Sequence, residues 1–109
     1  MRGMERRLPA FILDRQGALA ALCQRTQARR LAVFGSAVRD DFEPSRSDVD
    51  FLVAFEDLPP IAYSNAYFEL KQGLEDLFAR PVDLLTPAML QNPYLRARVE
   101  AEQLAVYGS

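Results

Sequence analysis

The most constraining feature of this sequence is the segment VDFLVAF, residues 49–55, which follows directly on an aspartate and contains a second one. A nearly continuous apolar run of this length is typical of a strand buried on both faces. Because alternate residues of a strand project to the same face, Asp48 and Asp50 should converge while Val49 and Phe51 point into the core. Two uncompensated carboxylates at a buried strand are costly. The segment therefore predicts a cation between the aspartates, unless residues 49–55 do not form a strand.

The rest of the chain predicts alternating helices and strands. Apolar spacing and capping residues predict helices, β-rich runs predict strands, and a proline pair predicts a loop. In chain order the expected elements are a helix over 14–30 with Asp14 as its cap, a strand over 30–36, the strand over 49–55, a loop over 57–64, a helix over 65–80, a strand over 81–87 and a helix over 92–107 with Asn92 as its cap. This order predicts an α/β fold, a small mixed three-stranded sheet with packed helices, in one domain spanning residues 1–109.

Composition excludes several classes of function. The 109 residues carry a formal net charge of −2, whereas a dedicated nucleic-acid binder usually has a strong basic excess, so no direct nucleic-acid partner is expected. The absence of histidine removes Ser-His-Asp and Cys-His nucleophilic systems and most zinc chemistry. A single cysteine, Cys23, on an apolar helical face predicts core packing and fits a reducing compartment. No membrane-spanning segment is apparent, so a cytoplasmic protein is expected.

A third acid, Asp83, lies in the middle of the strand expected over 81–87. If that strand neighbours the one over 49–55, Asp48, Asp50 and Asp83 meet at one point. Three hard carboxylates could clamp two Mg²⁺ ions, with Mn²⁺ as the alternative, roughly 3.5–4 Å apart. The sequence thus predicts, in outline, a site for phosphoryl or nucleotidyl transfer.

The Gly35-Ser36 pair at the end of the strand over 30–36 could bind the phosphates of a nucleotide. Glycine lets the backbone approach a ligand closely, and exposed amides after a strand form an anion-binding nest. The Ser36 hydroxyl could donate to a phosphate oxygen, and Arg39 could add a bidentate contact. Each residue also has a simpler explanation, namely a turn, a solvated arginine, or for Asp83 a charge that protects a sheet edge.

Together these residues resemble a known family. Gly35-Ser36, eleven intervening residues and Asp48-Val49-Asp50 resemble the hG[GS]…Dh[DE]h signature of the polymerase-β-type nucleotidyltransferase superfamily. RPVDLLTP resembles the strand that carries that family's third aspartate, and the tail NPYLRARVEAEQLAVYGS is similar to the minimal nucleotidyltransferase branch. The resemblance extends from about residue 19 to residue 107. It departs at Asp40, where the most frequent form of the loop has glycine, and at Asp41.

The resemblance implies an antitoxin that transfers AMP from ATP to a tyrosine of a HEPN-type ribonuclease toxin. Gly35 and Ser36 would hold the nucleotide phosphates. Asp48 and Asp50 would bind both metal ions, and Asp83 would complete the site as candidate general base. A small-molecule nucleotidyltransferase of the antibiotic-modifying kind is one alternative, and a catalytically idle module that neutralises its partner by contact is another. The sequence leaves open whether the chain forms a homo- or hetero-oligomer.

Overall fold

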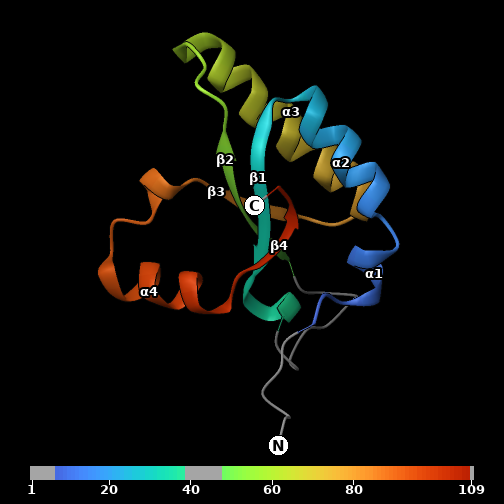
Figure 1. Cartoon of the computed structure of the whole chain (residues 1–109), viewed down its shortest axis with the longest axis vertical. Helices are drawn as coiled ribbons and strands as arrows, with labels where there is room; N and C mark the ends of the chain where they lie inside the picture. The colour runs from blue at the N-terminus through green and yellow to red at the C-terminus, as the bar shows by residue number, and fades with distance from the viewer. Residues whose placement is uncertain (1–6, 39–47, 109) are drawn as a thin grey trace, which may run out of the picture.

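The computed structural model of the chain describes residues 7–38 and 48–108. Helices and strands alternate along it, as the apolar patterns predict (Figure 1). The elements are α1 (Ala10–Leu13), α2 (Gln16–Arg25), β1 (Ala28–Phe34), the 3₁₀ turn η1 (Gly35–Val38), β2 (Val49–Phe55), α3 (Pro60–Phe78), β3 (Val82–Leu85), the 3₁₀ turn η2 (Pro87–Met89), α4 (Pro93–Glu102) and β4 (Leu104–Tyr107).

The strands form one mixed sheet of four strands in the order β3-β2-β1-β4. β1 pairs antiparallel with both β2 and β4, whereas β2 and β3 run parallel. A parallel pair needs a crossover connection, and α3 supplies it between β2 and β3. This order places β3 at an edge of the sheet, directly beside β2.

Helices cover the two faces of the sheet unequally. Figure 1 shows α2 and α3 on one side of the sheet and α4 on the other. The main core lies on the α2–α3 side, where Val49, Phe51 and Val53 of β2 are fully buried against Leu70 and Leu74 of α3, among others. The opposite face carries a smaller apolar cluster, formed by Phe34, Leu52, Leu90 and Val99 with Leu85 packed against it. That smaller cluster lies on the sheet face to which Asp50 belongs, because residues 50 and 52 share a face.

The fold class predicted from the sequence is confirmed, but the strand count is wrong. The last helix was expected to run to residue 107, whereas α4 ends at Glu102 and residues 104–107 form the strand β4. β4 is paired along β1, with Val33 opposite Leu104. Pairing with β1 makes this segment a strand. The local sequence, which includes Ala105 and Val106, does not by itself distinguish a strand from a continued helix.

Two further expectations need correction. Asp14 is not the cap of α2, because it ends the short helix α1, and α2 is preceded by Arg15 without a side-chain cap. The segment over 57–64 is not wholly a loop, since α3 begins at Pro60, where proline's fixed φ and missing N–H suit the first helical turn. Asn92 does cap α4, its side chain accepting from the amides of Tyr94 and Leu95.

Candidate active site

Asp50 and Asp83 lie side by side on neighbouring strands. In the parallel pairing of β2 with β3, Asp50 is the register partner of Asp83. Neighbouring strands are about 4.8 Å apart, and side chains at paired positions point to the same face. Asp50 is half-buried and Asp83 is exposed. The two carboxylates therefore share the sheet face that carries the smaller apolar cluster, as the sequence predicts for neighbouring strands.

Asp48 is exposed and directly precedes β2, on the same side as Asp50 by strand alternation. Within residues 7–38 and 48–108, no three His, Cys, Asp or Glu side chains are gathered closely enough to hold a metal ion as they stand. The donor chemistry of Asp50 and Asp83 nevertheless fits Mg²⁺, which takes only one or two protein carboxylates and completes its shell with water and phosphate oxygens. The three-aspartate cluster stays a prediction.

The turn after β1 brings Gly35 against Asp50. Phe34 is the register partner of Asp50 across the β1–β2 pair, so the next residue of the chain lies beside that carboxylate. Gly35 has φ +74°, and a Cβ added to it would come within 2.3 Å of Asp50 Oδ2. Two separate features therefore require glycine at position 35: the left-handed backbone conformation and the close approach of the Asp50 carboxylate. The glycine predicted as a ligand-approach position is also the one that makes room for Asp50.

The amide of Gly35 already has a partner. Gly35 N–H donates to Glu102 Oε1 at 2.9 Å, and Glu102 is a buried carboxylate at the end of α4. Sequence reasoning missed Glu102, since a glutamate among the charges of a surface helix carries no distinguishing signal. Ser36, the second residue of the turn, is half-buried. The third residue expected to bind nucleotide, Arg39, lies outside the described residues, as do Asp40 and Asp41.

Side chains of α3 hold the backbone on either side of Asp83. Tyr67 Oη donates to the carbonyl oxygen of Leu84 at 2.6 Å, and Val82 N–H donates to Glu75 Oε2 at 3.2 Å. β3 is an edge strand, so its outward backbone groups need such partners. The two contacts fix the strand at the residues immediately before and after Asp83.

Glu75 also pairs with Lys71, whose Nζ lies 2.9 Å from Glu75 Oε2. This hydrogen bond is the largest influence raising the pKa of Lys71, and the negative charge of Asp83 adds to it. The pKa of Glu75 is lowered, first by Lys71 and then by the Val82 amide. Lys71 therefore places a positive charge within electrostatic reach of Asp83, at the edge of the sheet.

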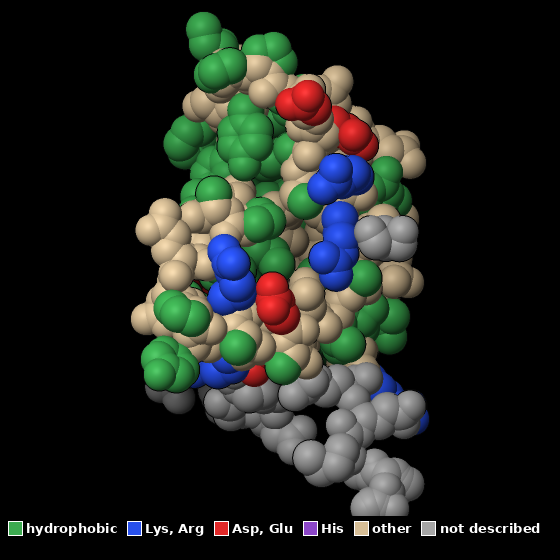
Figure 2. Space-filling view, turned by 60° about the vertical axis from the view of Figure 1, so that its left-hand side comes forward, with side chains coloured by type: hydrophobic (Ala, Val, Ile, Leu, Met, Phe, Trp, Pro, Cys, Tyr) green, Lys and Arg blue, Asp and Glu red, His purple; other side chains and the backbone are tan. Residues whose placement is uncertain are grey.

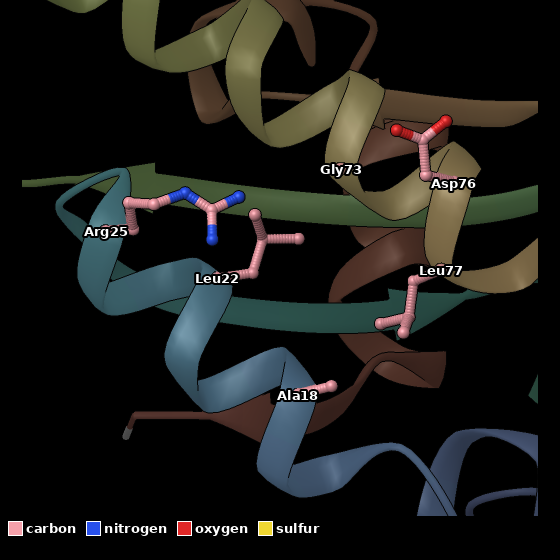
Figure 3. A pocket seen from close by; sticks show the side chains of 6 residues that line it. All are labelled: Ala18, Leu22, Arg25, Gly73, Asp76 and Leu77. Atoms are coloured by element: carbon pink, nitrogen blue, oxygen red, sulfur yellow. The ribbon is translucent and has the colours of Figure 1, made fainter.

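A separate hollow of about 340 Å³ lies between α2 and α3. Figure 3 shows the residues that line it, Ala18, Leu22, Arg25, Gly73, Asp76 and Leu77, all from these two helices. The helices cover the sheet face opposite Asp50. The hollow is thus distinct from the candidate site. Across the described part of the chain, none of the helices has the length and apolar character needed to cross a membrane.

Known proteins resemble this chain in sequence and in fold. The family model described as "Nucleotidyltransferase domain" matches residues 16–106. Protein adenylyltransferase MntA of Thermococcus cleftensis is 38% identical over 71 residues, which cover 65% of this chain and 68% of that protein. A solved structure described as a candidate minimal nucleotidyltransferase is 35% identical, with a TM-score of 0.69 over 85% of this chain and 90% of that one.

A more distant structural neighbour comes from a complex. It is the tri-AMPylated HEPN toxin of Shewanella oneidensis with its MNT antitoxin, and the matched chain is 22% identical to the present one. The TM-score is 0.60, over 90% of this chain and 73% of that chain. At this identity the likeness concerns the fold.

Proposed function

Because this chain belongs to the nucleotidyltransferase domain family, we propose that it transfers AMP from ATP to a tyrosine hydroxyl of a HEPN-type toxin and thereby acts as its antitoxin. The observation that carries the proposal is the in-register pair Asp50 and Asp83 beside the close-approach turn at Gly35. It supplies carboxylates on adjacent strands next to a backbone that a triphosphate can approach. The adenylyltransferase named MntA and the AMPylated toxin complex support the choice of AMP and of a protein acceptor.

In the proposed reaction, the tyrosine oxygen attacks the α-phosphorus of ATP, a new P–O bond forms, and the bond to pyrophosphate breaks. Asp83 accepts the phenolic proton, and its exposure suits a residue that must meet an acceptor from another molecule. Asp48, Asp50 and Asp83 would hold divalent ions. When bound, these ions neutralise charge on the triphosphate and the leaving pyrophosphate. Gly35 allows the phosphates to approach, and the Ser36 hydroxyl donates to them.

A protein acceptor also agrees with the exposed apolar side chains of the molecule. Ile61 and Phe68 of α3 are 79% and 64% exposed, and their spacing of seven residues places them on one side of the helix. Tyr94 at the start of α4 is 87% exposed. Figure 2 shows hydrophobic side chains gathered at the top of this view, over the beginning of α3, with Lys and Arg side chains lower on the same face. Such a surface offers contact area to a protein partner.

Mass spectrometry of the intact partner tests the proposal. The chain is incubated with a HEPN-type protein proposed as its partner, ATP and Mg²⁺, and each transferred AMP should add about 329 Da to that protein. Asp50→Asn should still bind the toxin and add no mass. Neutralisation without any mass change would favour the idle binding module. Equally fast adenylylation of a small-molecule alcohol would favour the antibiotic-modifying alternative.

Calorimetry separately tests the proposed metal requirement. ATP should bind measurably with Mg²⁺ or Mn²⁺ and much more weakly in excess chelator, because the carboxylates of the site repel an uncomplexed triphosphate. Equal affinity under both conditions would contradict a site organised around metal ions.

A further inference from the structure

Glu102 is a carboxylate that the proposed reaction does not use, yet it contacts Gly35, the first residue of the turn expected to bind nucleotide phosphates. It is the last residue of α4 and is only 7% exposed. Its Oε1 accepts the Gly35 amide at 2.9 Å, across a sequence separation of 67 residues. A buried carboxylate is costly unless strong hydrogen bonds compensate it, and bonds from a backbone N–H to an ionised acceptor are among the stronger ones.

The sheet brings Glu102 to this position. β4 begins two residues after Glu102 and pairs with β1, where Leu104 lies opposite Val33. Val33 is in turn two residues before Gly35. The pairing therefore brings the end of α4 close to the end of β1. Glu102 is held in place by α4 and β4, and Gly35 is held in place by β1.

The hydrogen bond from Gly35 to Glu102 holds the turn at the residue that lies against Asp50. Gly35 adopts a left-handed φ of +74°, and its Cα lies against the Asp50 carboxylate. Its amide already donates to Glu102, so in this arrangement the phosphates would need another donor, and the Ser36 hydroxyl is the one that the sequence predicts. The orientation of those donors relative to Asp50 depends on how Gly35 is held.

We propose that Glu102 is a positioning residue, which holds the Gly35 turn in the orientation that lets nucleotide phosphates approach Asp50. This inference rests on the proposed nucleotidyl transfer. For this role, the side chain at position 102 must carry a hydrogen-bond acceptor and must be as long as glutamate. Glutamine retains that acceptor, methionine keeps the side-chain length without it, and aspartate is shorter by one methylene.

The test compares Glu102→Met and Glu102→Gln with the control variant Glu100→Met, which changes an exposed glutamate of the same helix. The KM for ATP is measured in the AMP-transfer assay, and thermal unfolding is measured in parallel. Glu102→Met should raise the KM about tenfold or more, as expected for the loss of a hydrogen bond to a charged acceptor. Glu102→Gln and Glu100→Met should stay near the wild-type KM. In NMR spectra, the Gly35 amide should exchange with solvent faster in Glu102→Met than in the other variants.

The inference would be overturned if Glu102→Met had the same KM for ATP as the wild type and the same rate of solvent exchange at the Gly35 amide. Equal impairment of Glu102→Gln and Glu102→Met would also overturn it, because acceptor capacity would then not be what matters. If Glu102→Met does not unfold cooperatively, Glu102→Asp replaces it, with the same expected rise in KM and the same contrary result. A wild-type protein that transfers no AMP would instead contradict the proposed function, and the inference would fall with it.

Discussion

Asp50 and Asp83 lie side by side on the only parallel strand pair in the described sheet. From this relationship we expect Asp50→Asn and Asp83→Asn each to lower AMP transfer by about 100-fold or more, because a neutral amide is a poor ligand for a hard cation. Thermal unfolding should show that both variants still fold, so that the loss of transfer reports on the site and not on the stability of the protein. Asp57→Asn, at an exposed aspartate beyond the other end of β2, serves as the control. Wild-type transfer rates in both site variants would mean that the aspartates are structural.

The two glycines at positions 35 and 17 provide a matched pair. Gly35→Ala should abolish most activity and destabilise the fold, because the new Cβ would meet Asp50 Oδ2 at 2.3 Å in a backbone conformation that alanine disfavours. Gly17→Ala in α2 meets no atom within 4 Å and should stabilise the helix by about 0.5–1 kcal/mol. Urea denaturation and the AMP-transfer assay measure both effects. An active, fully stable Gly35→Ala variant would show that the turn can move away from Asp50.

Tyr67 is expected to act on catalysis through the position of β3. Tyr67→Phe removes the hydroxyl that donates to the Leu84 carbonyl, and should lower the free energy of unfolding by about 1 kcal/mol. Transfer activity should fall as well, because the strand that carries Asp83 loses one of its anchors. Tyr94→Phe changes an exposed tyrosine and should alter neither stability nor the fold of the sheet. Unchanged stability in Tyr67→Phe would indicate that water replaces the hydroxyl without cost.

Cys23 should make stability depend on alkaline pH. Burial raises the pKa of its thiol from the ordinary 9.0 to about 11, so the folded state holds this proton more tightly than the unfolded state does. The resulting stabilisation is complete below pH 9 and is lost as the pH rises through about 11. The free energy of unfolding of the wild type, measured relative to Cys23→Ala by urea denaturation, should therefore decrease between about pH 9 and about pH 10.5. A difference that stays constant over this interval would contradict the burial of the thiol.

Local patterns in the sequence were sufficient for most elements and for the face of each strand on which Asp50 and Asp83 lie. The apolar run over 49–55 coincides with β2, and Val49 and Phe51 are buried as alternation requires. The helix predicted over 65–80 is confirmed within α3, which buries Leu70, Leu74 and Phe78 on one face. These features follow from periodicity, which is a property of neighbouring residues and needs no knowledge of the rest of the chain.

Only the tertiary structure decided the pairing of distant segments. The register that sets Asp50 beside Asp83 depends on how β3 docks after α3, and β4 forms only because β1 presents an edge to it. The contact of Glu102 with Gly35 arises from the same pairing and has no local signature. A hydrogen bond across 67 residues is determined by topology, whereas sequence patterns report which face of its own element a residue occupies. The aspartates could therefore be predicted from the sequence, and the residues that hold the turn and the strand around them could not.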